Sequence, residues 1–203
     1  MNELLSRLDA DLDPNPYWIR IVGADWFADD LRLDISLRTS DETEPELWEI
    51  SCAGVYEESI SSMGAETLLL SGNSLLLKPY KELEVDIAFS ENRLVPEFLF
   101  GVLCSCCIEG LGRAERIAKF LRTTPNTLAI ASSPYGMLGR FPSSIAEEIL
   151  LSLEGQPIRA NALPGTAPGR WNKSEFVEYP ATISALEIGS SYVIAAAFSA
   201  CRV

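Results

Sequence analysis

The segment Leu31-Arg-Leu-Asp-Ile-Ser-Leu-Arg38 alternates apolar and polar side chains without a break. A period of two is typical of a β-strand with one buried face and one face in water. The pattern predicts that Leu31, Leu33, Ile35 and Leu37 face a core. Asp34 then lies on the opposite, solvent-facing side.

Similar patterns surround this segment in the first half of the chain. Strand-like runs are predicted at residues 17–22, 48–52, 68–78 and 83–89, with a tight turn at 71–74. Alternation with one polar face favours an antiparallel sheet covered on one side only. We expect the open face of this sheet to carry four acidic residues, namely Asp34, Glu49, Glu84 and Asp86.

The middle of the chain predicts helices. Their expected ranges are 96–109, 113–122 and 144–154. The last has a capping-box pattern, Ser144 to Glu147, and Gly155 directly after its predicted end. Because these helices need an apolar surface to cover, we predict an α+β fold, with an antiparallel sheet from the N-terminal half and about three helices packed on one face.

The length favours a single globular domain over residues 1–203. It would consist of a strand-rich part at 17–90, a helical part at 96–154, and a part at 156–203 with a long loop and C-terminal strands. The loop is predicted at 156–182 and contains Arg170, Trp171 and Lys173, which form a candidate binding patch, with a surface loop of no binding role as the alternative.

Composition excludes several kinds of function. The chain has no histidine, which excludes Ser-His-Asp triads, Cys-His dyads and His-ligated metals. Acidic residues outnumber basic ones by 29 to 16, and residues 1–60 alone hold 15 acidic and 4 basic residues. Phosphate contacts need Lys and Arg, so we expect no nucleic-acid binding by the acidic half. A basic protein partner is the alternative to an acidic surface that only confers solubility.

The five cysteines predict neither a disulfide framework nor a metal site. Cys104-Ser-Cys-Cys107 lies in an apolar segment, where cysteine packs as a small hydrophobic side chain. We expect Cys104 and Cys107 to be buried in a core and Cys106 to differ from them, because it points elsewhere on the helix. We expect no metal and no cofactor.

The sequence also predicts a cytoplasmic protein. The first residues show no basic region followed by an apolar run, so no signal peptide is expected. The longest apolar stretches, at 98–108 and 192–201, are too short to span a bilayer, so no membrane association is expected.

The segment 75–91, then Pro96 and the helix to Leu111, resembles small uncharacterised bacterial proteins of toxin–immunity loci. The shared order is paired leucines, an aromatic residue, a strand, a proline and a helix, preceded by a strand similar to Trp48–Cys52. The similarity covers roughly residues 17–122. Such families commonly have His-Pro before the paired leucines, where this chain has Asn73-Ser74. The resemblance implies no catalytic residues.

The leading hypothesis from the sequence is therefore a non-enzymatic immunity protein that occludes a basic bacterial toxin. Complementary charge would speed the encounter of the two proteins. One alternative is an acidic secretion chaperone or adaptor for an effector, and an exposed apolar patch would favour it. The other is an enzyme with a Cys or carboxylate centre.

Overall fold

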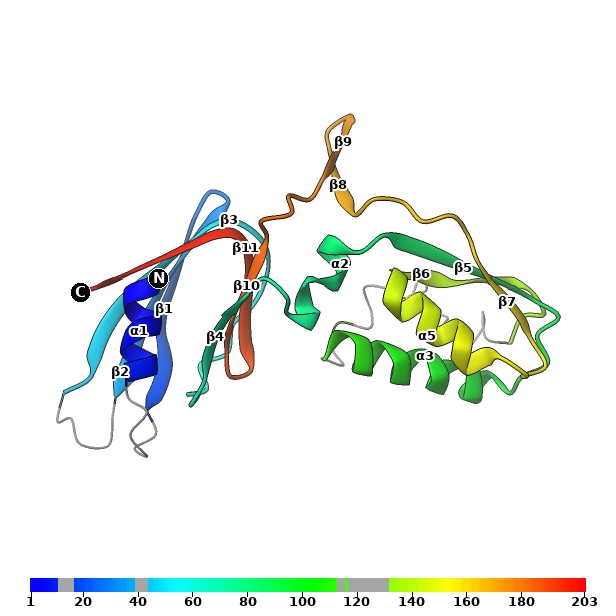
Figure 1. The fold of residues 1–203 in the computed structure, drawn as a ribbon, viewed down its shortest axis with the longest axis horizontal. Coiled ribbons are helices and arrows are strands. Elements are labelled where there is room, and N and C mark those ends of the chain that lie inside the picture. Colours follow the sequence, from blue (N-terminus) through cyan, green and yellow to red (C-terminus); the bar gives the residue numbers. More distant parts are fainter. Residues whose placement is uncertain (11–16, 39–43, 113–115, 117–131) are drawn as a thin grey trace. The chain divides into compact units, whose positions relative to one another are not determined.

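The computed structural model describes residues 1–10, 17–38, 44–112, 116 and 132–203. These residues form two compact units, called unit 1 (Met1–Leu77 with Pro180–Val203) and unit 2 (Lys78–Tyr179). Antiparallel sheets and helices together confirm the predicted α+β class (Figure 1).

Unit 1 is built on a six-stranded antiparallel sheet with the strand order β1-β2-β3-β11-β10-β4. The strands are β1 (Trp18–Phe27), β2 (Asp30–Arg38), β3 (Glu46–Ser59), β4 (Leu68–Ser71), β10 (Ser184–Ile188) and β11 (Ser191–Arg202). Among the described residues the unit also contains helix α1 (Asn2–Ala10) and the short helix η1 (Leu75–Leu77). The strand predicted at 68–78 is thus right for β4 and wrong for η1. The C-terminal strand β11 lies at the centre of the sheet, paired with β3 and β10.

The core of unit 1 confirms the face predicted from the alternation in β2. Leu31, Leu33, Ile35 and Leu37 are each at most 2% exposed. Helix α1 packs against β11 and adds Leu4 and Leu8 to the same core. Burial of this many aliphatic side chains is the main stabilising contribution in the unit.

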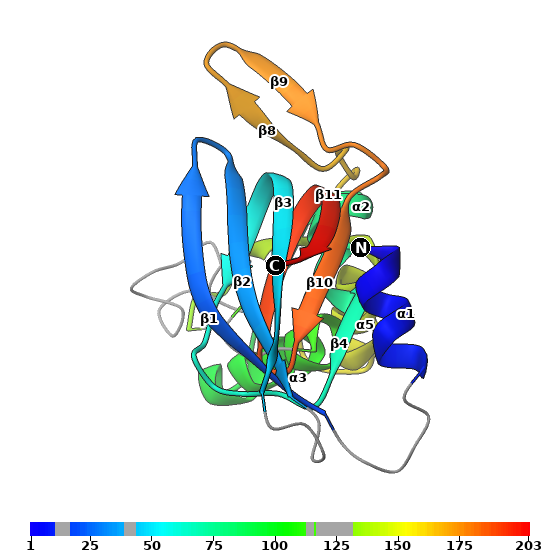
Figure 2. The same ribbon diagram turned by 90° about the vertical axis from the view of Figure 1, so that its left-hand side faces the viewer.

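The sheet of unit 1 curves until its two edges meet at one point (Figure 2). Ile19 of β1 and Ala65, just before β4, exchange two backbone hydrogen bonds of 2.7 and 2.8 Å. Trp18 lies against Gly64, where a Cβ atom would come within 2.1 Å of the indole ring, so glycine is required there. Beyond Ile19, this edge of β1 is no longer paired with described residues.

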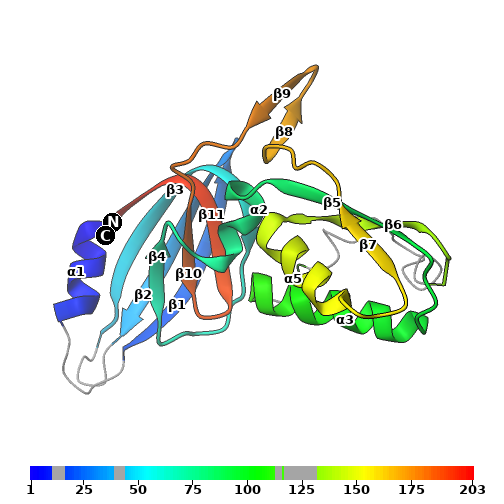
Figure 3. The ribbon, with the colours of Figure 1, turned by 45° about the vertical axis from the view of Figure 1, so that its right-hand side comes forward.

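Unit 2 has its own three-stranded antiparallel sheet, in the order β6-β5-β7. Its strands are β5 (Glu84–Ser90), β6 (Gly136–Pro142) and β7 (Arg159–Ala162), and its helices are α2 (Lys78–Lys81), α3 (Pro96–Leu111) and α5 (Ser143–Leu153). Figure 3 shows α3 and α5 side by side along this sheet. A separate hairpin is formed by β8 (Gly169–Asn172) and β9 (Glu175–Glu178).

The structure differs from the sequence prediction in having two hydrophobic cores. The run at 83–89 was expected to join the N-terminal sheet, but β5 pairs with β6 and β7 instead. Helices α3 and α5 therefore pack with β5 in the core of unit 2, while α1 covers the sheet of unit 1. That residues 1–203 behave as one domain stays a prediction.

The predicted helix at 144–154 is present, but its capping box is not. No side chain of the helix caps its N-terminus. Glu82, just after α2, accepts hydrogen bonds from the Ser144 backbone N–H (2.8 Å) and from the Ser144 hydroxyl (3.0 Å). A carboxylate stabilises the partial positive charge of a helix N-terminus, so a residue distant in sequence replaces the local cap. The predicted helix at 113–122 falls, except for residue 116, outside the described residues.

The predicted long loop at 156–182 is wrong in part. It contains β7, which pairs with β5, and the β8–β9 hairpin. The two strands of the hairpin join through Lys173 and Ser174, and Lys173 has φ 58. A positive φ at a hairpin turn usually calls for Gly, Asn or Asp, so the sequence offers no standard turn signal here.

Candidate functional site

Asp34 and Glu49 are brought together as expected, but with an arginine between them. They are directly opposite residues of β2 and β3 on the outer face of the unit 1 sheet. Arg32 lies 3.8 Å from Asp34, 3.7 Å from Glu49 and 2.9 Å from Asp25. The hydrogen bond to Asp25 is the largest cause of a raised pKa for Arg32. One cation thus faces three carboxylates on this face.

Glu84 and Asp86 form a second, separate cluster in unit 2. Arg140 of β6 is directly opposite Asp86 and donates two hydrogen bonds to it, of 2.8 and 3.3 Å. Its other terminal nitrogen lies 3.6 Å from Glu84. Burial raises the pKa of Glu84, and this effect outweighs the attraction of Arg140.

The four predicted acidic residues therefore do not share one open face. Asp34 and Glu49 belong to unit 1, whereas Glu84 and Asp86 belong to unit 2. Each pair of carboxylates has an arginine within ion-pair distance. The positive charge of that arginine reduces the negative electrostatic field that the carboxylates present to a partner. Alternation along one strand predicts the direction of a side chain but not the sheet to which that strand belongs.

The turn between β1 and β2 carries a feature that the sequence analysis missed. Trp26 and Phe27 are 51% and 56% exposed, although both are large apolar side chains. Phe27 lies under the Arg32 guanidinium, 5.3 Å from its ring centroid. The signal in the sequence was the pair of aromatics within Asp25-Trp-Phe-Ala-Asp-Asp30, beyond the end predicted for the first strand.

The β1–β2 turn is also acidic and held by β3. Asp25, Asp29 and Asp30 are exposed. The Val55 backbone N–H donates to the Asp29 carbonyl (2.9 Å), and the Gly54 N–H donates to the Asp30 carboxylate (2.8 Å). We call residues Val22–Asp30 the acidic aromatic tip. Exposed aromatics beside charged groups have the composition of protein-binding hot spots.

The predicted patch at Arg170, Trp171 and Lys173 lies on the β8–β9 hairpin. Trp171 is 71% exposed, and its ring meets Phe176 edge-on at 5.8 Å. Nearly all strand residues of the hairpin are exposed, and among described residues its strands pair only with each other. Glu175 and Glu178 lie opposite Asn172 and Gly169 on β8, so the hairpin is not a purely basic patch.

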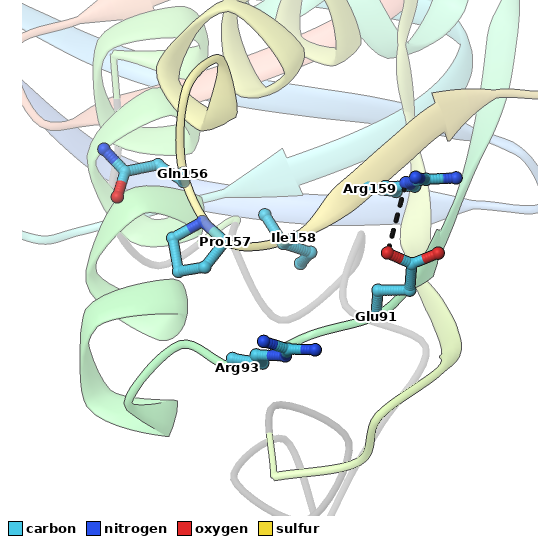
Figure 4. A pocket seen from close by; sticks show the side chains of 6 residues that line it. All are labelled: Glu91, Arg93, Gln156, Pro157, Ile158 and Arg159. Atoms are coloured by element: carbon cyan, nitrogen blue, oxygen red, sulfur yellow. Dashed lines mark ion pairs between the residues drawn. The ribbon is translucent and has the colours of Figure 1, made fainter.

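A shallow cavity of about 270 Å³ lies in unit 2 beside the start of β7 (Figure 4). Its lining is Glu91, Arg93, Gln156, Pro157, Ile158 and Arg159. Arg159 forms an ion pair of 3.2 Å with Glu91, so an anionic ligand would have to compete with that carboxylate. A neighbouring hollow of about 380 Å³ shares Ile158 and Arg159 and is otherwise lined by α5 and β7 with the residues between them.

The cysteine cluster is divided between the core and the surface of α3. Cys106 and Cys107 are buried with Leu99, Leu103 and Leu111. Cys104 is only half-buried, so the prediction was right for Cys107 and wrong for Cys104, and Cys106 is buried although it was expected to differ. Burial raises the pKa of Cys107 to about 12, and that of Cys52 likewise to about 12. Neither is a thiolate at neutral pH, which argues against both as nucleophiles.

Metal-binding geometry was searched for in the described part of the chain. It contains no group of three or more Cys, Asp or Glu side chains placed to hold a metal ion. None of its helices is long and apolar enough to cross a membrane. In comparisons with known proteins, no family model, no curated protein and no solved structure matches this chain.

Proposed function

We propose that this protein is a non-enzymatic immunity protein that occludes a basic bacterial toxin in the cytoplasm. The observation that carries the proposal is how charge divides between the two units. Unit 1 holds 17 acidic and 5 basic residues, whereas unit 2 holds 12 acidic and 11 basic residues. Nearly all of the net charge of −13 therefore belongs to unit 1.

This division gives the molecule one strongly acidic unit and one nearly neutral unit. Charge concentrated on one unit steers a basic partner toward that unit and discourages acidic ones. The acidic aromatic tip adds apolar contact area to the same unit. Such a surface supports binding, and the raised pKa values of the buried Cys52 and Cys107 thiols argue against these two residues as nucleophiles.

A secretion chaperone or adaptor is the second candidate, and one observation favours it. Val22, Trp26 and Phe27 are each more than half exposed on β1, and an adaptor needs such an apolar patch to hold an effector segment. The two candidates differ in their partner: an immunity protein binds a folded toxin and abolishes its activity. An adaptor instead binds an unfolded or terminal segment and leaves the activity of the folded effector intact.

The first test is co-expression of the chain with a basic toxin encoded in the adjacent reading frame. We expect growth to be rescued and the purified toxin to be inhibited stoichiometrically. Binding without loss of toxin activity would favour the adaptor. No rescue and no binding would overturn the immunity function.

The second test asks whether unit 1 steers the encounter. Asp29→Asn, Asp30→Asn and Glu58→Gln together remove three exposed charges from unit 1. Glu147→Gln, Glu148→Gln and Glu154→Gln remove three exposed charges from unit 2 as the matched control. We expect a lower association rate and a weaker salt dependence for the unit 1 variant alone. Equal effects of both variants would show that net charge, rather than unit 1, attracts the partner.

A further inference from the structure

The edge of β1 beyond Ile19 has the geometry of a site for strand addition. β1 is the terminal strand of the sheet, and Ile19 is its last residue bridged to the segment before β4. Among described residues, none pairs with that side of β1 between Val22 and Phe27. An unpaired edge presents backbone N–H and C=O groups to which another extended chain can bind.

The side chains of this edge do not protect it in the usual way. Protected edge strands carry Lys, Pro or inward-pointing charges. Here the segment from Val22 to Phe27 contains neither Lys nor Pro, and Val22, Trp26 and Phe27 are 57%, 51% and 56% exposed. Trp18, on the same strand, is also an exposed aromatic residue, but its ring packs on Gly64 and so already has a partner within the sheet. The protective features that this edge does have are the irregularity in register between Ile21 and Gly23 and the single charged side chain of Asp25.

The charge around the edge selects the occupant. Asp25, Asp29 and Asp30 are exposed at the end of β1, and Arg32 is engaged by Asp25 from the neighbouring strand. A second copy of this chain would bring together two acidic units, each with 17 acidic and 5 basic residues, and their like net charges repel each other. A basic segment instead meets carboxylates.

We propose that the Val22–Phe27 edge of β1 receives an extended basic segment of a protein partner as an added β-strand. Apolar side chains of that segment contact Val22 and Trp26, and its Lys or Arg side chains meet Asp25, Asp29 and Asp30. The inference rests on the proposed function and deepens it, because it names the part of unit 1 that binds the basic partner and the mode of binding.

The test uses an eight-residue peptide of alternating Lys and Val with a fluorescent label. Its control is the same peptide with N-methyl groups on alternate backbone nitrogens, which keeps charge and side chains but removes strand pairing on one edge. We expect the N-methylated peptide to bind at least about tenfold more weakly, as expected when several backbone hydrogen bonds are lost. Hydrogen exchange should show new protection of amides within residues 22–27 when the unmodified peptide is bound.

Two protein variants locate the binding edge. Val22→Thr with Trp26→Thr removes the apolar contacts without changing charge or strand propensity. Leu69→Thr makes a similar change on β4, the terminal strand at the other side of the sheet, where Leu69 is 56% exposed. We expect the first variant to bind the peptide roughly tenfold more weakly and the second to bind it like the wild type. Circular dichroism verifies that both are folded.

Several results would overturn the inference. Equal affinity of both peptides would mean attraction by charge alone, and protection of residues 22–27 in a peptide-free dimer would make a second copy the occupant. Equal neutralisation of a toxin by the wild type and the Val22→Thr, Trp26→Thr variant would also overturn it, while the immunity function would stand. Conversely, edge-specific peptide binding without any neutralised toxin would support the edge site and contradict the immunity function.

Discussion

Asp34 of β2 lies directly opposite Glu49 of β3, so two carboxylates are neighbours across the β2–β3 ladder of unit 1. Like charges in this position repel each other and destabilise a sheet. Arg32, within 4 Å of both, offsets that repulsion and adds Asp25 of β1 to the group. The outer face is therefore stabilised by a charge network across three strands.

Arg32→Met should destabilise unit 1 because it leaves Asp25, Asp34 and Glu49 without their common cation. The loss should be smaller at high salt, since screening weakens repulsion between exposed carboxylates. Urea unfolding at low and high salt measures both effects. Arg20→Gln, an exposed arginine on β1, is the control. Adding Asp34→Asn to Arg32→Met should restore part of the stability, and no recovery would argue against repulsion as the cause.

Ala28→Gly should stabilise the protein. Ala28 is the first residue of the two-residue turn between Phe27 and Asp30 and has φ 56, a region that costs an L-residue about 1–2 kcal/mol. Glycine avoids that cost but has a more flexible unfolded state, so we expect a net gain of about 0.5–1 kcal/mol. Ala24→Gly, within β1, should instead be destabilising. Chemical denaturation of both variants compares them, and a loss at Ala28 would contradict the strained turn.

Glu84→Gln tests the raised pKa of this carboxyl group. The pKa of Glu84 is higher in the folded protein than in the unfolded chain. At pH values between these two pKa values, the folded protein therefore binds more protons than the unfolded chain. Ionised Glu84 is thus unfavourable at neutral pH, and the glutamine variant should be at least as stable as the wild type there. Its advantage should shrink as the pH falls from about 7 to about 4. Glu147→Gln, at an exposed position, is the control. An advantage that grows on acidification would contradict the assignment.

Cys107→Ser and Cys104→Ser form a matched pair on one helix. Cys107 is fully buried, so a hydroxyl there loses packing and must find a hydrogen-bond partner, at a cost of about 1–3 kcal/mol. Cys104 is half-buried, and we expect less than about 0.5 kcal/mol for its substitution. Thermal unfolding measures the difference, and equal effects would contradict the assignment of the two faces of α3.

Thiol labelling gives an independent check on the same residues. Cys201 is exposed and should react first with a thiol reagent. Cys52 and Cys107 combine burial with a pKa raised to about 12, so they should react only when the protein opens. Mass spectrometry of the labelled peptides identifies the order of reaction. Early labelling of Cys107 would place it at the surface.

Local patterns predicted the elements that depend only on neighbouring residues. The alternation in Leu31–Arg38 predicted both the strand and its buried face, and the 144–154 segment predicted a helix close to its observed bounds. Period and turn chemistry are encoded within a few residues, so they can be read directly from the sequence. The predicted capping box failed because the helix begins at Ser143 rather than after Ser144, and Glu82, 62 residues before Ser144, accepts the hydrogen bonds of Ser144.

The sequence by itself determined the α+β class, the apolar faces and the acidity of the first half of the chain. Only the tertiary structure decided that β5 begins a second sheet, that Arg32 and Arg140 form ion pairs with the predicted acidic residues, and that Trp26 and Phe27 are exposed at an acidic turn. Side-chain direction follows from the local backbone, whereas strand pairing and ion pairs join residues distant in sequence. Their free energy depends on which segments meet, and no local pattern contains that information.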